Sequence, residues 1–171
     1  MKNVIVTGGC GFIGSNWIAK NVHKYRILNI DAMLTGSNPD NLMFHPDDPD
    51  DLFQFNVPVE ASSHYSFLKE DISKLRPNQI NFVPDAILNF AAESHVDRSI
   101  TDPLSFAQSN VMGTANLLKI ACRFPNVRFI HVSTDEVSAI FHWIQKISSK
   151  RAPTTTHAVH IQLPRPLPII S

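Results

Sequence analysis

Cysteine and tyrosine are scarce in this chain: its 171 residues include two of each. Cys10 and Cys122 are too few to frame a disulfide scaffold, so we expect reduced thiols. The 15 lysines and arginines balance the 15 aspartates and glutamates, and this neutrality gives no support for a nucleic-acid partner or an anionic membrane surface. No apolar run near the N-terminus is long enough for a signal peptide or a membrane span, so we expect a soluble, cytoplasmic protein.

Short apolar runs alternate with helical patterns along the first four fifths of the chain. Strands are predicted over residues 3–7, 26–30, 66–69, 86–91 and 128–132. A first helix begins near Phe12, a weak one covers 73–82, and a long one covers 104–123. Their predicted inner faces hold Ile13, Trp17, Ile18 and Val22 in the first helix, and Phe106, Val111, Leu117, Leu118 and Ala121 in the long one. This order predicts an α/β fold, a Rossmann-type doubly wound parallel sheet truncated after its fifth strand.

Two segments fall outside this alternation. Residues 33–66 contain four prolines and an acidic cluster, which predicts a solvated surface loop. Residues 138–171 contain three consecutive threonines and then Pro164, Pro166 and Pro168, which suit neither a helix nor a central strand. We therefore predict an incomplete nucleotide-binding domain at 1–137 and a poorly ordered tail at 138–171.

A glycine pattern, Gly8-x-x-Gly11-x-x-Gly14, lies between the first predicted strand and the first predicted helix. In that context glycines permit a tight turn and let the backbone approach a pyrophosphate, while the helix N-terminus supplies free amides. Asp31 ends the second strand, where a carboxylate accepts hydrogen bonds from a ribose diol and repels a 2′-phosphate. The pattern predicts NAD rather than NADP; the alternative is a glycine turn and an Asp cap without a ligand.

Two carboxylates and a hydroxyl, Thr134, Asp135 and Glu136, come directly after the fifth predicted strand. This is the edge at which an open α/β sheet carries its chemistry. Adjacent carboxylates suit acid and base roles, because their surroundings can separate their pKa values; alone, the pair could equally cap or solvate a strand end. The histidines lack partners with zinc-site spacing, so we predict no metal site at His95, at His131 or at His157-x-x-His160.

Further segments narrow the interpretation: Asp71-Ile72, Asn89-Phe-Ala-Ala-Glu-Ser-His-Val-Asp-Arg-Ser99, Asn110-Val-Met-Gly-Thr114 and His131-Val-Ser-Thr-Asp-Glu-Val137. With the glycine spacing, they make residues 1–137 resemble the dTDP-glucose 4,6-dehydratase family of extended short-chain dehydrogenase/reductases. The resemblance implies an NAD site lined by Gly8, Gly11, Phe12, Ile13, Gly14, Asp31, Asp71, Ile72, Phe90, Ala91, Ala92 and Ser109. Beside the sugar it implies Ser94, His95 and Thr134.

The reaction implied by the resemblance has three steps. Hydride leaves sugar C4 for NAD, water is eliminated across C5 and C6, and the hydride returns to C6. In this scheme Asp135 protonates the departing C6 hydroxyl and Glu136 removes the C5 proton. A nucleotide sugar, dTDP-glucose by resemblance, would be the substrate, and family members form homodimers.

The chain departs from the family in the residues that begin this reaction. The family removes the C4 hydroxyl proton with a Tyr-x-x-x-Lys pair, and here Tyr25 and Tyr65, the two tyrosines of the chain, both precede the carboxylate motif. Without that base the elimination lacks an activated carbonyl, so we expect weak or no activity. The run Ala32-Met-Leu-Thr-Gly-Ser-Asn38 also differs from the family's Lys-Leu-Thr-Tyr-Ala-Gly-Asn-like run, which leaves the adenosine contacts open.

A frame shift is our hypothesis for the tail. When residues 157–166 are back-translated and each third base is read with the next two bases, the genetic code permits Arg-Ser-Pro-Tyr-Ser-Ala-Ser-Lys-Ala, which holds the missing Tyr-x-x-x-Lys pair. Loss of one base near codon 138 would convert a Val-Tyr-Gly-Asp coding run into Val137-Ser138-Ala139 and a shifted continuation. Nucleotide reads across codon 138 decide the matter, because an uninterrupted frame that encodes Ser138-Ala139 refutes the hypothesis.

Three functional hypotheses follow. The leading one is a frame-shifted, truncated product of a dTDP-glucose 4,6-dehydratase gene, with little or no activity. The others are a catalytically dead NAD-binding module and an active nucleotide-sugar epimerase or decarboxylase of the same fold. In the first case the strand at 128–132 exposes an edge, the family homodimer is compromised, and solubility is poor.

Overall fold

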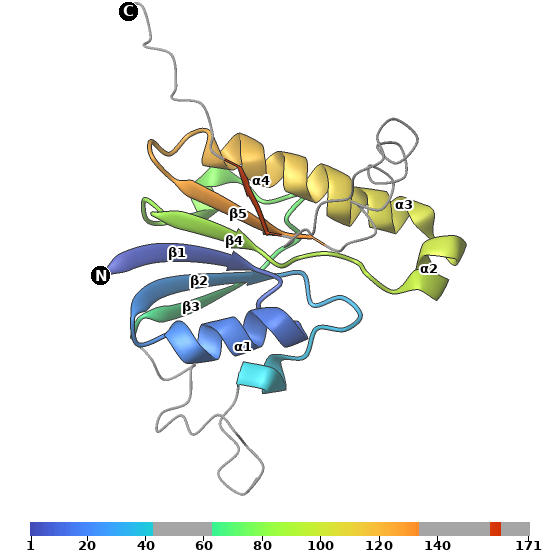
Figure 1. Cartoon of the computed structure of the whole chain (residues 1–171), viewed down its shortest axis with the longest axis horizontal. Helices are drawn as coiled ribbons and strands as arrows, with labels where there is room; N and C mark the ends of the chain where they lie inside the picture. The colour runs from blue at the N-terminus through green and yellow to red at the C-terminus, as the bar shows by residue number, and fades with distance from the viewer. Residues whose placement is uncertain (43–62, 134–157, 162–171) are drawn as a thin grey trace, which may run out of the picture.

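The strands of this chain form one six-stranded sheet. The computed structural model describes residues 1–42, 63–133 and 158–161, and within them the strand order is β3-β2-β1-β4-β5-β6. Five strands run parallel and β6 runs antiparallel to β5 (Figure 1). The bounds are β1 Lys2–Thr7, β2 Tyr25–Asp31, β3 Tyr65–Lys69, β4 Ala86–Asn89, β5 Arg128–Val132 and β6 Ala158–Ile161. The five parallel strands confirm the predicted Rossmann-type sheet.

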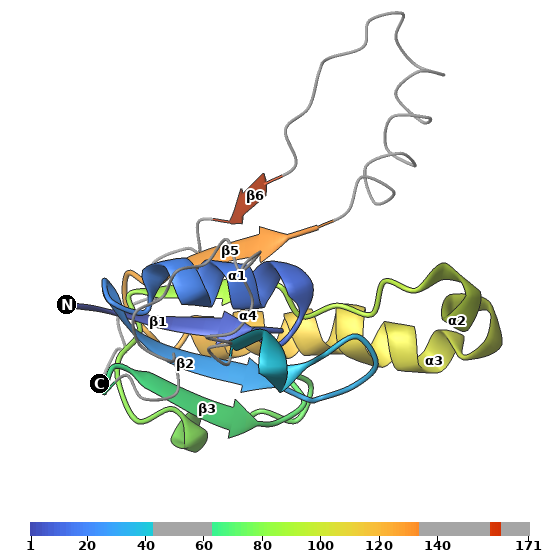
Figure 2. The same ribbon diagram turned by 90° about the horizontal axis from the view of Figure 1, so that it is seen from below.

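Helices cover both faces of the sheet, each over a core of its own. α1 (Phe12–Asn21) lies on one face and α4 (Thr114–Ala121) on the other (Figure 2). The core beneath α1 includes Val4, Val6, Ile18, Ile27 and Leu88. The core beneath α4 includes Ile5, Leu28, Ile87, Leu117 and Phe129. Alternate residues of a central strand enter opposite cores, which is why these strands read as unbroken apolar runs.

The prediction for the first helix is confirmed in part, and the prediction for the second is wrong. Ile18 of α1 and Val22, the residue directly after it, are buried as expected, but Ile13, predicted on the same face, is 58% exposed. The helix predicted over 73–82 is wrong, because that stretch contains only a 3-10 turn, η3 (Pro77–Gln79). The cause is Pro77, which keeps the residue before it in an extended conformation and so interrupts a helix.

The long helix predicted over 104–123 has three parts. α3 (Pro103–Phe106) leads into a π-helical segment, η4 (Ala107–Gly113), and then into α4, which ends at Ala121. A π-helical turn closes its hydrogen bonds over five residues, so it rotates the side chains away from the α-helical pattern. Val111 is 64% exposed, which corrects its prediction as an inner residue. α2 (Val96–Thr101) and α3 extend beyond the carboxyl ends of the strands (Figure 1). None of the helices described is long and apolar enough to cross a membrane.

The predicted tail, residues 138–171, contains one described strand, β6, which lies at the edge of the sheet. Ala158–Ile161 pairs with β5, with Phe129 opposite Ile161 and Val132 opposite Ala158. Four residues without proline suffice for an edge strand, and Pro164, Pro166 and Pro168 all follow it in the sequence. The edge of β5 that the sequence predicts to be exposed is therefore covered here; residues 134–157 and 162–171 lie outside the described part.

Asn89 ties together the carboxyl ends of the central strands. Its side chain is fully buried, and its Oδ1 accepts hydrogen bonds from the Thr7 hydroxyl of β1 at 2.6 Å and from the Ala91 N–H at 3.2 Å. Its Nδ2 donates to the Thr114 hydroxyl of α4 at 3.3 Å and lies 2.9 Å from Nδ1 of His131 on β5. All four hydrogen-bonding positions of the amide are used, so one side chain joins three strands and a helix.

Replacing Asn89 by alanine should lower the free energy of unfolding by about 2–4 kcal/mol, because its buried partners lose their hydrogen bonds. Urea denaturation followed by circular dichroism measures the change. Asn81→Ala is the matched control, since Asn81 is exposed and its loss should cost less than about 0.5 kcal/mol. Equal losses in the two variants would show that the Asn89 hydrogen bonds add nothing to stability.

Candidate functional site

One cleft of about 480 Å³ opens at the carboxyl ends of β1, β2 and β4. It brings together every described residue for which the sequence predicts a binding role. The predicted cofactor residues in its lining are Gly8, Gly11, Phe12, Ile13, Gly14, Asp31, Asp71, Ile72, Phe90, Ala91, Ala92 and Ser109, and the predicted sugar residues are Ser94 and His95. Thr134, Asp135 and Glu136, the predicted catalytic residues, lie outside the part of the chain that the structure describes.

The glycine turn brings the β1–α1 connection against the end of β4. Gly8 has a φ of 70°, and a Cβ on it would lie 2.6 Å from the Ala91 nitrogen, so a side chain has neither the conformation nor the space. A Cβ on Gly14 would collide with the Gly8 carbonyl oxygen, because α1 packs directly on the turn. These glycines therefore serve two of the expected purposes, the tight turn and the close packing of helix on sheet.

The first turn of α1 directs backbone donors into the cleft. Gly11 is the N-cap residue, no side chain caps the helix, and no acidic residue lies in its first turn. N–H groups in a first helical turn have no partner within the helix and carry the positive end of its dipole, so they attract a phosphate. Phe12 and Ile13 lie here with 81% and 58% of their surface exposed, and such exposure of adjacent apolar residues is typical of a ligand-binding surface.

Asp31 is fixed in orientation at the end of β2. It is 4% exposed, and its Oδ1 accepts hydrogen bonds from the Met33 N–H and the Ser37 hydroxyl, both at 2.8 Å. Its Oδ2 accepts from the Cys10 N–H at 2.9 Å. The sequence identifies Asp31 and predicts a loop after it, but not that the backbone of Met33 and the hydroxyl of Ser37 in this loop hold the carboxylate.

Cys10 joins the glycine turn to this carboxylate through its backbone. Besides the N–H that Asp31 accepts, the Cys10 carbonyl accepts a hydrogen bond from the Asn38 N–H at 2.9 Å. Burial and, after it, the charge of Asp31 raise the pKa of the Cys10 thiol to about 11. Roughly one such thiol in a thousand is ionised near pH 8. The side chain is therefore structural and not a nucleophile.

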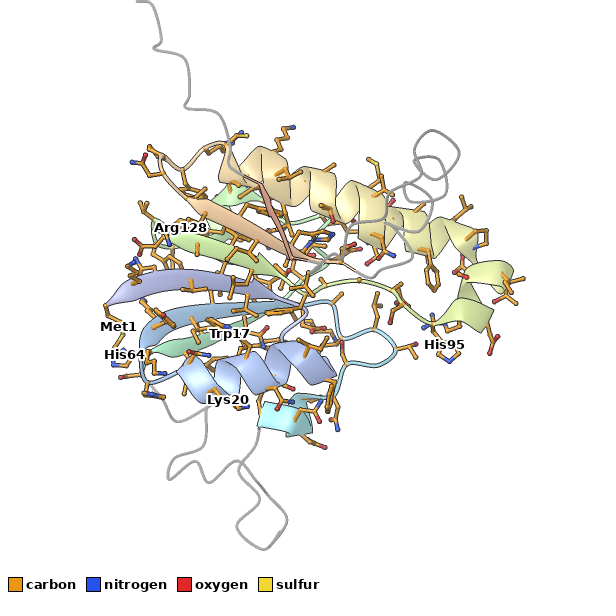
Figure 3. The ribbon with its side chains drawn as sticks, in the orientation of Figure 1. Met1, Trp17, Lys20, His64, His95 and Arg128 are labelled. Carbon is orange, nitrogen blue, oxygen red and sulfur yellow. The ribbon has the colours of Figure 1, made fainter. Side chains whose placement is uncertain are left out.

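A partly buried ion pair shapes the loop after β4, at the other end of the cleft. Glu93 is 8% exposed, and its carboxylate lies 3.4 Å from the guanidinium of Arg98 on α2. Asn110 of η4 contacts the Glu93 backbone twice, accepting from its N–H and donating to its carbonyl, each at 2.8 Å. Figure 3 shows His95 in this region, beyond the strand ends and far from His64 at the opposite edge. The sequence does not single out Glu93 or Arg98, because their roles depend on pairing in the fold.

The charge of the cleft is negative. Among the residues that the structure describes, Asp31, Glu70, Asp71 and Glu93 line it, against a single cation, Arg98. A bound phosphate would therefore depend on backbone N–H groups more than on basic side chains. In the described segments no three His, Cys, Asp or Glu side chains are grouped to hold a metal ion.

Neither tyrosines nor lysines appear in the cleft lining, as far as the chain is described. Tyr25 and Tyr65 are the first residues of β2 and β3, so they lie at the end of the strands opposite Asp31. Tyr25 stacks on Trp17 with ring centroids 5.9 Å apart, and the Tyr65 hydroxyl accepts a hydrogen bond from Asn29 at 3.0 Å. These positions fit the expectation that neither tyrosine removes a proton from a sugar.

His131 is held as a neutral acceptor in the Asn89 network. The Ala91 N–H fixes Oδ1 of Asn89, so Nδ2 of Asn89 donates to Nδ1 of His131 and the ring proton lies on Nε2. Burial lowers the pKa of His131 below its ordinary value of 6.5. The unfolded chain thus binds this proton more tightly, and the stability that neutral His131 confers is complete above about pH 6.5 and is lost as the pH falls.

The free energy of unfolding should therefore decrease between about pH 7.5 and about pH 5.5, and His131→Gln should reduce that decrease. Urea denaturation at several pH values measures it. His23→Gln is the control, because His23 is exposed and its replacement should leave the pH dependence unchanged. The same pH dependence in His131→Gln and the unchanged chain would contradict the assignment.

Known proteins share both the sequence and the fold. Residues 5–138 match the family model described as GDP-mannose 4,6 dehydratase. A dTDP-glucose 4,6-dehydratase from Xanthomonas campestris is 38% identical over 154 residues, which cover 80% of this chain and 39% of that protein. Its counterpart from Haemophilus influenzae is 36% identical, with 80% and 40% covered. The chain thus spans about two fifths of the length of the curated relatives it matches.

Solved structures agree with this match. The dTDP-glucose 4,6-dehydratase of Bacillus anthracis, in complex with NAD, has a TM-score of 0.57 and 31% identity, covering 80% of this chain and 39% of that chain. A dTDP-glucose 4,6-dehydratase from Streptomyces venezuelae with NAD bound also has a TM-score of 0.57 and 31% identity, covering 71% and 36%. Because the family model covers most of the chain and the fold agrees, this chain belongs to the GDP-mannose 4,6 dehydratase family, as its resemblance to dTDP-glucose 4,6-dehydratases implies.

Proposed function

We propose that the cleft binds NAD. The observation that carries this proposal is the convergence of the glycine turn, the start of α1 and the Asp31 carboxylate on one cleft. In the proposed complex, backbone N–H groups at the start of α1 hold the pyrophosphate, Asp31 accepts from the adenosine ribose, and Ile72 and Ala91 contact the rings. The NAD-bound structures of two similar proteins support the same ligand here.

The charges of the cleft favour NAD over NADP. Asp31 lies where the adenosine ribose is proposed to sit, and its carboxylate would repel a phosphate on the 2′ oxygen. Arg98, the one basic residue in the described lining, is paired with Glu93 at the other end. A 2′-phosphate would therefore meet a negative charge without a compensating cation.

The parent activity is proposed to be that of a dTDP-glucose 4,6-dehydratase. The 38% identity to a curated dehydratase supports it, as do the motifs around Asn89 and Asp135. In this proposal Ser94, His95 and Thr134 contact the sugar, Asp135 protonates the C6 hydroxyl, and Glu136 removes the C5 proton. Bound NAD would supply the oxidant for sugar C4, and the nucleotide sugar would be the substrate.

We propose further that this chain does not complete the reaction. Its cleft, where described, contains no tyrosine or lysine to begin the oxidation, and no tyrosine follows residue 65 in the sequence. The frame-shift hypothesis supplies a reason, because the genetic code permits an out-of-frame translation of residues 157–166 that contains the missing pair. Binding without turnover is the expected behaviour.

Titration calorimetry of the full chain with NAD, together with a turnover assay on dTDP-glucose, tests these proposals. We expect saturable NAD binding, at least about tenfold weaker binding of NADP, and no detectable dehydrated sugar. Gly14→Ala should weaken NAD binding at least about tenfold, because its methyl group would push α1 away from the glycine turn.

Asn81→Ala, an exposed substitution remote from the cleft lining, is the control and should bind NAD normally. A cooperatively melting chain that binds no NAD would contradict the binding proposal. Sustained turnover would instead contradict the proposed inactivity and leave the binding proposal intact.

A further inference from the structure

The turn after β2 presents Ser37 to the same cleft as Asp31. The Ser37 N–H donates to the Leu34 carbonyl at 3.1 Å, and Gly36 has a φ of 89°, so residues 34–37 form a tight turn with glycine in the left-handed position. The Ser37 hydroxyl lies 2.8 Å from Oδ1 of Asp31. It must be the donor, because an ionised carboxylate has no proton to give.

Asp31 has room for one more hydrogen bond. A carboxylate offers about four lone-pair positions, two on each oxygen. Met33 and Ser37 occupy both positions on Oδ1, and Cys10 occupies one on Oδ2. A ribose presents two neighbouring hydroxyls, so an Asp31 that keeps its present partners can accept from only one of them.

We propose that Ser37 accepts the hydrogen bond of the second ribose hydroxyl, a specificity contact that rests on the NAD-binding function proposed above. The proton of Ser37 is committed to Asp31, so its oxygen has lone pairs to offer to the cleft. Donation to a carboxylate polarises that oxygen and makes it a better acceptor. Asp31 and Ser37 thus share the diol, one hydroxyl each.

The turn is held in place before any ligand arrives. The Cys10 carbonyl accepts from the Asn38 N–H at 2.9 Å and from the Asn41 side chain at 3.2 Å. Met33 has a φ of 59°, a conformation that a residue other than glycine keeps only where its surroundings enforce it. Because the turn is anchored on both sides of Ser37, a neighbouring group is not expected to move in and replace a lost Ser37 hydroxyl.

The test compares three ligands, NAD and its analogues that lack the 2′ or the 3′ hydroxyl of the adenosine ribose, by titration calorimetry. Ser37→Ala should weaken NAD binding about fivefold, the loss expected for one hydrogen bond. For the analogue that lacks the hydroxyl bound by Ser37, the unchanged chain and Ser37→Ala should have equal affinity. Ser37→Thr keeps the hydroxyl and should bind NAD nearly as the unchanged chain does.

Ser63→Ala, an exposed serine outside the cleft lining, is the control, and thermal melting checks that each variant folds. If Ser37→Ala does not fold, Ser37→Cys, which has similar volume and a weaker acceptor, takes its place. If Ser37→Ala binds all three ligands more weakly by the same factor, Ser37 acts only by orienting Asp31, and the proposal is overturned. NAD binding by Ser37→Ala that equals that of the unchanged chain would also overturn it. A folded, unchanged chain that binds no NAD would overturn the proposed function itself, and the Ser37 contact with it.

Discussion

The hydrogen bonds of Asn89 align the carboxyl ends of β1, β4 and β5, and the walls of the cleft depend on that alignment. Its Oδ1 fixes the Ala91 N–H, the group that the Gly8 backbone approaches too closely for any side chain. Its Nδ2 fixes Thr114 and so the start of α4. A buried amide with all its partners satisfied has one favourable arrangement, whereas an apolar contact in its place would tolerate sliding of one strand against the next. Because Nδ1 of His131 takes part in this fixed arrangement, the stability of the site depends on the protonation of His131.

The parts of the site that the residue pattern predicts without the family resemblance are those with a local cause. The spacing of Gly8, Gly11 and Gly14 reflects backbone geometry within one turn, and Asp31 follows its strand directly, so both are visible without the fold. Ser37 and the Glu93–Arg98 pair escape such reasoning because their partners are decided by tertiary packing. The misplacement of Val111 has another origin: this residue lies within a π-helical segment, which a regular helical period cannot reveal. The sheet itself was predictable because its central strands are buried on both faces.

Binding and chemistry occupy different stretches of this chain. All residues proposed to hold the dinucleotide fall between Gly8 and Ser109, whereas the proposed acid and base are Asp135 and Glu136, and the family's tyrosine and lysine would come later still. A change in the sequence after residue 137 would therefore remove the start of the oxidation while leaving the dinucleotide cleft with every predicted side chain. The four carboxylates of the described cleft lining fit this separation, since a negatively charged group cannot replace the ammonium that the family uses.

The pairing of β6 with β5 affects the stability of the sheet that carries the cleft. A buried parallel sheet with an open edge invites association with other chains, and each backbone hydrogen bond left unmade at that edge costs stability. Ala158–Ile161 covers β5 from Phe129 to Val132, next to the strand that carries Asn89. Backbone pairing does not require a particular side-chain sequence, so a segment unrelated to the family can fill this position if it lacks proline there. Under the frame-shift hypothesis the tail supplies no catalytic group, yet this pairing would still support the alignment of β4 and β5 on which the cleft depends.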